Sequence, residues 1–251
     1  MARDPKQELC DEVGHDLRVL AEILSRRQLS PVGYRALENA SYALRQNRTG
    51  TEVLRAELTD IDLYIGGSIR FKPSSVQLDR RLIVDIIFEQ SLDMACNGDV
   101  LGSIRNNSVN FTLKAEKVGA RTRKQLISAW HFDLHKYGAA PVGACHPKYH
   151  WQFGGWGLKE VSDDISGVLV TDAPRLFAPP MDPVLALDFL LSHFNGPEWN
   201  YVRNNEPRYK SVVQNSQARL WKPYFDAIKD LFDISARGGD SPHVHLLPNM
   251  I

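Results

Sequence analysis

Apolar residues along this chain change their spacing twice, first from helical spacing to alternation and then back. Residues 6–27 place leucine and valine three or four positions apart, as one face of a helix requires. Residues from about 61 to 153 contain several stretches in which apolar and polar side chains alternate, as they do in half-buried strands. Helical spacing returns after residue 171. The pattern therefore predicts helices, then a sheet, then helices again.

The alternating region divides into separate strands at clusters of Gly, Asn and charged residues. Short polar connections between consecutive strands favour antiparallel pairing. Gly66-Gly67 falls inside the first strand and predicts a bulge or bend there. The predicted strands are residues 61–71, 82–92, 109–115, 126–135 and 149–153, with 168–171 as a short sixth.

Turn and cap residues divide the helical regions. Ser30-Pro31 begins a second N-terminal helix, so the two N-terminal helices are expected to form an antiparallel hairpin. Asp182-Pro183 begins a C-terminal helix that Asn195-Gly196-Pro197 ends, and residues 207–232 form a long helix bent near Pro223.

These elements predict the α+β class, with an antiparallel sheet of about five or six strands and helices packed on it. The predicted organisation is a helical hairpin in 1–50, the sheet in 51–171, a C-terminal helical layer in 172–234 and a tail in 235–251.

The charge balance limits the classes of partner. Lys plus Arg and Asp plus Glu each number 30, so no overall basic field attracts nucleic acid. A local patch remains at the turn after the third strand, where it either contacts phosphates or is simply a solvated turn. That patch consists of Lys114, Lys117, Arg121, Arg123 and Lys124.

The sequence also predicts a cytoplasmic protein without a membrane span. No apolar run approaches the ~18–20 residues that a spanning helix needs. The first residues lack the apolar segment of a signal peptide. Three cysteines, far apart and without a Cys-x-x-Cys pair, do not form a disulfide framework and suit a reducing compartment.

Four of the eight histidines fall between residues 131 and 150. Because strand side chains alternate faces, His131, Asp133 and His135 share one face while the residues between them are apolar. In the strand 149–153, His150 and Gln152 share a face in the same way. A register that places His135 near His150 gathers all these polar groups on one surface.

Imidazoles and a carboxylate gathered in this way predict a divalent metal site, with zinc favoured and manganese or iron as alternatives. The predicted ligands are His135, His146 and His150, with Asp133 able to replace His146. His131 lies about 13 Å along the strand from His135, so it is expected to support the site rather than share the ion. Asp133 and His131 are the predicted catalytic residues, Asp133 as a general base.

The resulting function hypothesis is a metal-binding hydrolase acting on a small-molecule phosphoester or amide. The alternative is a non-catalytic binding or scaffold subunit of a multi-protein bacterial complex, in which the same hairpin recognises a protein partner. Two further interpretations remain open, a binding pocket without metal and an ordinary polar sheet face.

The elements His131-Phe-Asp133 and His150-Trp-Gln152 also resemble the paired His-x-Thr/Ser motifs of the two-histidine phosphoesterases. That resemblance implies acid and base roles for two histidines on a cyclic phosphate. Here Asp133 and Gln152 replace the hydroxyl residues and only 19 residues separate the motifs, so no residue role is transferred.

Overall fold

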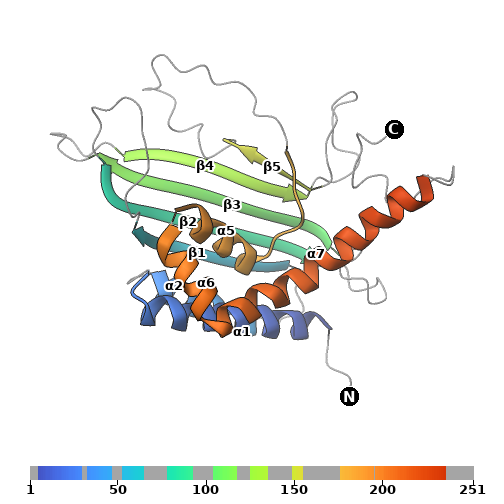
Figure 1. The fold of residues 1–251 in the computed structure, drawn as a ribbon, viewed down its shortest axis with the longest axis horizontal. Coiled ribbons are helices and arrows are strands. Elements are labelled where there is room, and N and C mark those ends of the chain that lie inside the picture. Colours follow the sequence, from blue (N-terminus) through green and yellow to red (C-terminus); the bar gives the residue numbers. More distant parts are fainter. Residues whose placement is uncertain are drawn as a thin grey trace, which may run out of the picture.

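The computed structural model describes residues 5–29, 33–46, 53–64, 78–92, 104–117, 125–134, 149–154, 176–194 and 196–235. Within these ranges the fold is α+β, with five helices and one six-stranded antiparallel sheet (Figure 1). The strands lie in the order of the chain, so each pairs with the next along the sequence. The predicted fold class is therefore confirmed.

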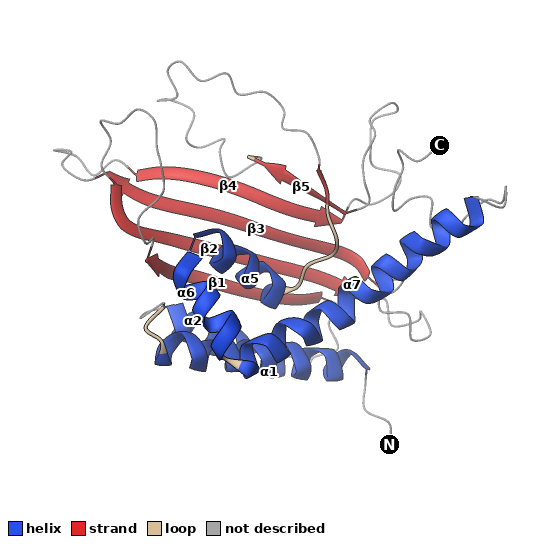
Figure 2. Cartoon of the chain, in the orientation of Figure 1, coloured by secondary structure: helices blue, strands red, loops and turns tan. Residues whose placement is uncertain are grey.

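The sheet consists of β1 (Val53–Tyr64), β2 (Leu78–Leu92), β3 (Ile104–Lys117), β4 (Gln125–Leu134), β5 (Tyr149–Phe153) and β6 (Leu176–Phe177). The helices are α1 (Pro5–Arg26), α2 (Gly33–Gln46), α5 (Pro183–Phe194), α6 (Gly196–Asn205) and α7 (Pro207–Ser235). Figure 2 shows these helices gathered at the β1 side of the sheet and across it, with β4 and β5 at the other side.

Strand alternation located five strands and misplaced some of their ends. The fifth strand has the predicted bounds, 149–153. The first strand, β1, begins at Val53, whereas its predicted start was residue 61. The predicted glycine bulge at 66–67 and the predicted sixth strand at 168–171 lie outside the described residues. The observed sixth strand is Leu176–Phe177, shortly before the start of α5.

The helix predictions missed one element. Asn195-Gly196-Pro197 was predicted to end a helix, and α5 does end at Phe194, but α6 begins at once with Gly196. Proline in the first turn of a helix removes no intrahelical hydrogen bond, so Pro197 suits this start as well as it suits a stop. Helix α7 continues through Pro223 to Ser235.

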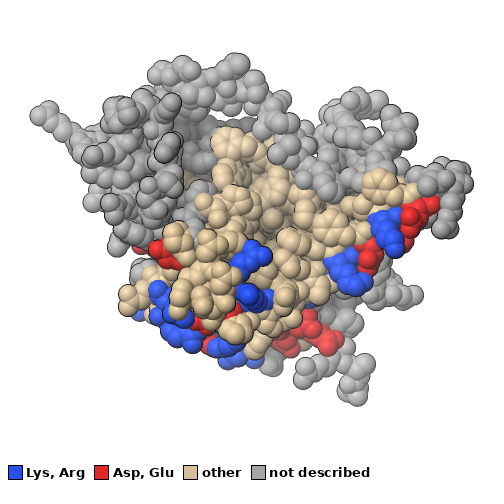
Figure 3. Space-filling model, viewed as in Figure 1, with Lys and Arg blue, Asp and Glu red and all other residues tan. Residues whose placement is uncertain are grey.

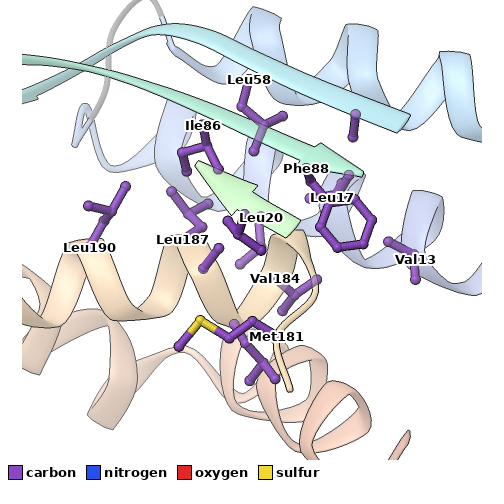
Figure 4. Packing of buried hydrophobic residues seen from close by; sticks show 14 of the residues in the cluster. Val13, Leu17, Leu20, Leu58, Ile86, Phe88, Met181, Val184, Leu187 and Leu190 are labelled. Atoms are coloured by element: carbon purple, nitrogen blue, oxygen red, sulfur yellow. The ribbon is translucent and has the colours of Figure 1, made fainter. Parts of the chain in front are cut away.

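The two faces of the sheet differ in polarity. On β2, Val84, Ile86 and Phe88 are at most 2% exposed and point toward the helices, whereas the intervening Ile87 is 39% exposed. Figure 4 shows Ile86 and Phe88 pointing into a core that Leu17 and Leu187 fill from the helices. The opposite face is mainly polar and carries His131, because Ile87 pairs with Asn110 and Asn110 pairs with His131.

A side chain on this polar face stabilises a bulge in β1. The register between β1 and β2 shifts between Leu58 and Ile61, and Asp60 there has a positive φ of 54°. Asp85 of β2 accepts the Asp60 backbone N–H at 2.9 Å and the Lys114 ammonium at 2.5 Å. One carboxylate thus satisfies the bulged backbone and pairs with the neighbouring strand.

The predicted N-terminal hairpin is present, and its two helices meet closely at Gly14. The Ser41 hydroxyl of α2 donates to the Gly14 carbonyl of α1 at 2.6 Å. A Cβ atom at position 14 would lie 2.7 Å from Arg45 Cγ and 3.1 Å from the Ser41 carbonyl oxygen. The absence of a side chain at Gly14 therefore allows this approach.

Helix α5 begins as the sequence predicts. The Asp182 carboxylate accepts the backbone N–H of Leu185 at 2.9 Å, and Pro183 occupies the first helical position. Val184, Leu187 and Leu190 on this helix are 0% exposed. No helix in the described part of the chain is long and apolar enough to cross a membrane.

Charged side chains gather along the helices at the bottom of Figure 3 and along the outer end of α7. The buried Glu206, directly before α7, accepts Arg26 at 2.5 Å and Arg27 at 2.5 and 2.9 Å. The Arg27 hydrogen bond holds the pKa of the Glu206 carboxyl below its usual value, against the opposing effect of burial. This contact joins the end of α1 to the junction of α6 and α7.

We expect Glu206→Gln to lower stability at neutral pH and to have a smaller effect in acid. A depressed folded-state pKa adds stability above the unfolded pKa, and that stability is lost as pH falls through the folded value. Melting curves of both proteins from pH 7 to pH 3 should therefore converge toward the acidic end. A constant difference across this range would contradict the ion-pair account.

Candidate metal centre

The candidate site lies on β4 and β5, on the polar face of the sheet. These strands pair antiparallel with Asp133 opposite His150 and His131 opposite Gln152. Directly paired residues project to the same side of a sheet, so all four side chains share one face. The intervening Trp130, Phe132 and Trp151 belong to the hydrophobic core or pack against it on the other face.

His131, Asp133 and His150 form a group whose ligand atoms all lie within 4.8 Å of one another. His131 Nε2 is 3.4 Å from Asp133 Oδ2 and 3.2 Å from Gln152 Oε1. The ring centroids of His131 and His150 are 6.5 Å apart, and the rings are nearly perpendicular at 80°. Two imidazoles and a carboxylate thus converge from two strands.

Burial differs across the group. His150 is 4% exposed, and the side chains of His131 and Asp133 are 16% and 36% exposed. The site is therefore sheltered at β5 and open to solvent at β4. Shelter strengthens the attraction between a cation and its ligands, and an opening admits water and a substrate.

The aromatic layer behind the site fixes the two strands. Phe132 stacks on Tyr149 at 6.1 Å and meets Trp151 edge-on at 5.9 Å. Backbone alternation places these rings directly behind the polar side chains, so the aromatic packing supports the strands that carry His131, Asp133 and His150. The predicted segregation of aromatic and polar side chains on this hairpin is present in the structure.

The group can accept a metal ion after its side chains draw together. Two adjacent ligand atoms bound at ~2.1 Å lie about 3.4 Å apart in a tetrahedron, so a pair at the 4.8 Å limit of this group must close by about 1.4 Å. Rotation of an imidazole or carboxylate moves a ligand atom by more than this. Nitrogen and carboxylate ligands of this kind suit zinc, manganese and iron.

The structure places three of the five predicted site residues together. His131, Asp133 and His150 are in the group, while His135 and His146 lie outside the described residues. His131 was expected to take part in catalysis and support the ligands, because its distance from His135 argued against a shared ion. A ring nitrogen of His131 belongs to the group that could hold an ion.

The observed register pairs His150 directly with Asp133. The sequence placed His135 near His150 without deciding which residue lies opposite it, and His135 lies outside the described residues. A shift of two residues keeps every side chain on its face, so the hydrophobic pattern cannot distinguish registers that differ by two.

Gln152 is the polar neighbour that was not predicted as a site residue. Its side-chain oxygen lies 3.2 Å from His131 Nε2, because the two residues are directly paired. The signal in the sequence is the alternation of β5, which puts Gln152 on the histidine face, but its partner depends on the register.

The predicted basic patch is only partly described. Lys114 lies within β3 and pairs with Asp85, so it is not at the turn. Lys117 is the last residue of β3, and Arg121, Arg123 and Lys124 lie outside the described residues.

Comparisons with known proteins give no match: no family model, no curated protein and no solved structure is significantly similar to this chain. Support for a metal centre therefore comes from the paired strands themselves. The three grouped side chains are two histidines and one aspartate, the same residue types as the ligands of a two-histidine, one-carboxylate metal centre.

Proposed function

We propose that this protein is a divalent-metal-dependent hydrolase of the cytoplasm, with its ion bound by His131, Asp133 and His150. The observation that carries the proposal is the convergence of these ligand atoms within 4.8 Å. Zinc is the favoured ion, with manganese and iron as alternatives. The scarcity and wide spacing of the cysteines support a reducing compartment.

Three protein ligands leave coordination positions for water and substrate, as in catalytic zinc sites. A bound ion lowers the pKa of such a water to about 7, which supplies a nucleophile at neutral pH. The water oxygen bonds to the phosphorus or carbonyl carbon of the substrate, and the bond to the leaving alcohol or amine breaks. The leaving group takes up the proton that the water releases.

Metal analysis of the protein, purified without a histidine tag, tests the proposal. We expect about one equivalent of zinc, manganese or iron. His131→Ala, Asp133→Ala and His150→Ala should each weaken zinc binding by at least about tenfold, because each removes a ligand. His193→Ala is the matched control, because this exposed histidine of α5 packs against Phe189 and is not a member of the group of His131, Asp133 and His150.

The substrate class is tested with bis(p-nitrophenyl) phosphate and p-nitroacetanilide after loading with each metal. Hydrolysis of either compound that is lost in His150→Ala and kept in His193→Ala supports the proposal. Failure of the purified protein to bind zinc, manganese or iron would overturn it and favour the scaffold hypothesis.

A further inference from the structure

A single hydrogen bond between Gln152 and His131 does not account for both oxygen neighbours of the His131 ring nitrogen Nε2. Nε2 of His131 has two oxygen neighbours, Gln152 Oε1 at 3.2 Å and Asp133 Oδ2 at 3.4 Å. A neutral imidazole carries one N–H, and that N–H cannot point well at two acceptors at once. A cation between the three atoms would satisfy all of them together.

The two distances match the spacing of neighbouring ligands on one ion. With bonds of ~2.1 Å, adjacent ligands lie about 3.0 Å apart in an octahedron and about 3.4 Å apart in a tetrahedron. The observed 3.2 and 3.4 Å fall within this interval. The separation of Gln152 Oε1 from His131 Nε2 is thus that of two neighbouring ligands on one ion.

We infer that Gln152 Oε1 is the fourth ligand of the ion, and that it is the ligand that the substrate displaces. This inference rests on the proposed function, because it needs an ion at His131, Asp133 and His150. A neutral amide oxygen binds a divalent cation more weakly than a carboxylate does. Gln152 is therefore the member of the set that leaves most easily.

Displacement of an amide oxygen selects the class of substrate. The carbonyl of an amide substrate is the same kind of donor as Gln152 itself, so it gains nothing by replacing it. An anionic phosphate oxygen attracts the cation more strongly and displaces the amide with a gain in free energy. The site therefore takes a phosphoester in preference to an amide.

A variant of the neighbouring strand offers a matched control. Asn110 of β3 is the other residue directly paired with His131, so the two amides flank the same imidazole on the same face. The Asn110 amide donates to Ser108 Oγ at 3.0 Å. Asn110→Ala thus removes an amide of similar chemistry and position without removing the proposed ligand.

The test uses full-length protein loaded with Co²⁺, which gives a visible spectrum sensitive to its ligands. In Gln152→Ala we expect the Kd for Co²⁺ to rise about tenfold and the spectrum to change. Inorganic phosphate should bind this variant about tenfold more tightly than wild type, because no amide must leave first. Gln152→Glu should bind Co²⁺ more tightly and phosphate more weakly, while Asn110→Ala should match wild type.

The outcomes separate the two proposals. A wild-type protein that binds neither Co²⁺ nor Zn²⁺ overturns the metal centre and this inference together. A wild-type protein that binds Co²⁺, with Gln152→Ala unchanged in affinity, spectrum and phosphate binding, overturns the fourth ligand alone. Equal effects of Gln152→Ala and Asn110→Ala also overturn it, since they would reflect a general change of the sheet face.

Discussion

Replacing Arg219 with methionine is expected to lower the free energy of unfolding by about 3–5 kcal/mol at pH 7. Arg219 of α7 binds the Asp16 carboxylate of α1 through both terminal nitrogens at 3.0 Å. It also donates to Asp182, before α5, at 3.2 Å. The substitution keeps much of the side-chain volume but leaves two carboxylates without their shared cation.

Both carboxylates are buried, which makes the loss large. The side chains of Asp16 and Asp182 are 4% and 5% exposed. Burial raises the pKa of the Asp16 carboxyl, although Arg219 opposes this effect. Without Arg219 the two like charges remain, partly compensated by the Ser216 hydroxyl that donates to Asp182.

Asp16→Asn is the control for this prediction. It removes one charge, keeps the shape and leaves Arg219 paired with Asp182, so we expect a loss of about 1 kcal/mol or less. Urea unfolding of the three proteins measures the difference. Similar losses in the two variants would show that Arg219 does not act as the shared cation.

Acid should reduce the effect of Arg219→Met. A carboxyl whose pKa is raised in the folded state favours folding when protonated, and this contribution is lost as pH rises from the unfolded to the folded pKa. Removing Arg219 should raise the Asp16 pKa further. The difference in stability between variant and wild type should therefore be smaller at pH 4 than at pH 7.

The ion pairs of Arg219 with Asp16 and Asp182 illustrate what the sequence could not predict. Asp182 could be recognised as a helix cap, because Pro183 and an apolar run follow it directly. Its pairing with Arg219 could not, and neither could the contact of Arg219 with Asp16 across 203 residues. Local patterns specify elements and their buried faces, whereas partners far apart in the chain depend on how the helices pack.

The candidate site was also predicted only in part: the sequence predicted which residues share a face of the sheet, but not which residues lie opposite one another. Alternation alone put His131, Asp133 and His150 on one face of a hairpin with aromatic residues behind them. The register, which decides that Asp133 rather than His135 lies opposite His150, was not encoded in that alternation. The position of His131 beside Asp133 and Gln152 depends on this register, so its face could be predicted and its neighbours across the strands could not.

Phe132→Ala is expected to lower the free energy of unfolding by about 3–5 kcal/mol, because it removes a fully buried aromatic ring. Its stacking on Tyr149 and edge contact with Trp151 would be lost, and a cavity would open between β4 and β5. Ile87→Ala is the control on the opposite face, where a 39% exposed side chain should contribute about 1 kcal/mol or less.

Phe132 also separates His131 from Asp133 along β4, so its removal tests how the core supports the site. The cavity lets β4 shift against β5, and ligands held less firmly bind an ion more weakly. We expect Phe132→Ala to weaken Zn²⁺ binding under conditions where the protein stays folded, and Ile87→Ala to leave it unchanged. Isothermal titration measures both. Unchanged binding in Phe132→Ala would mean that the backbone pairing of β4 with β5 alone positions the ligands.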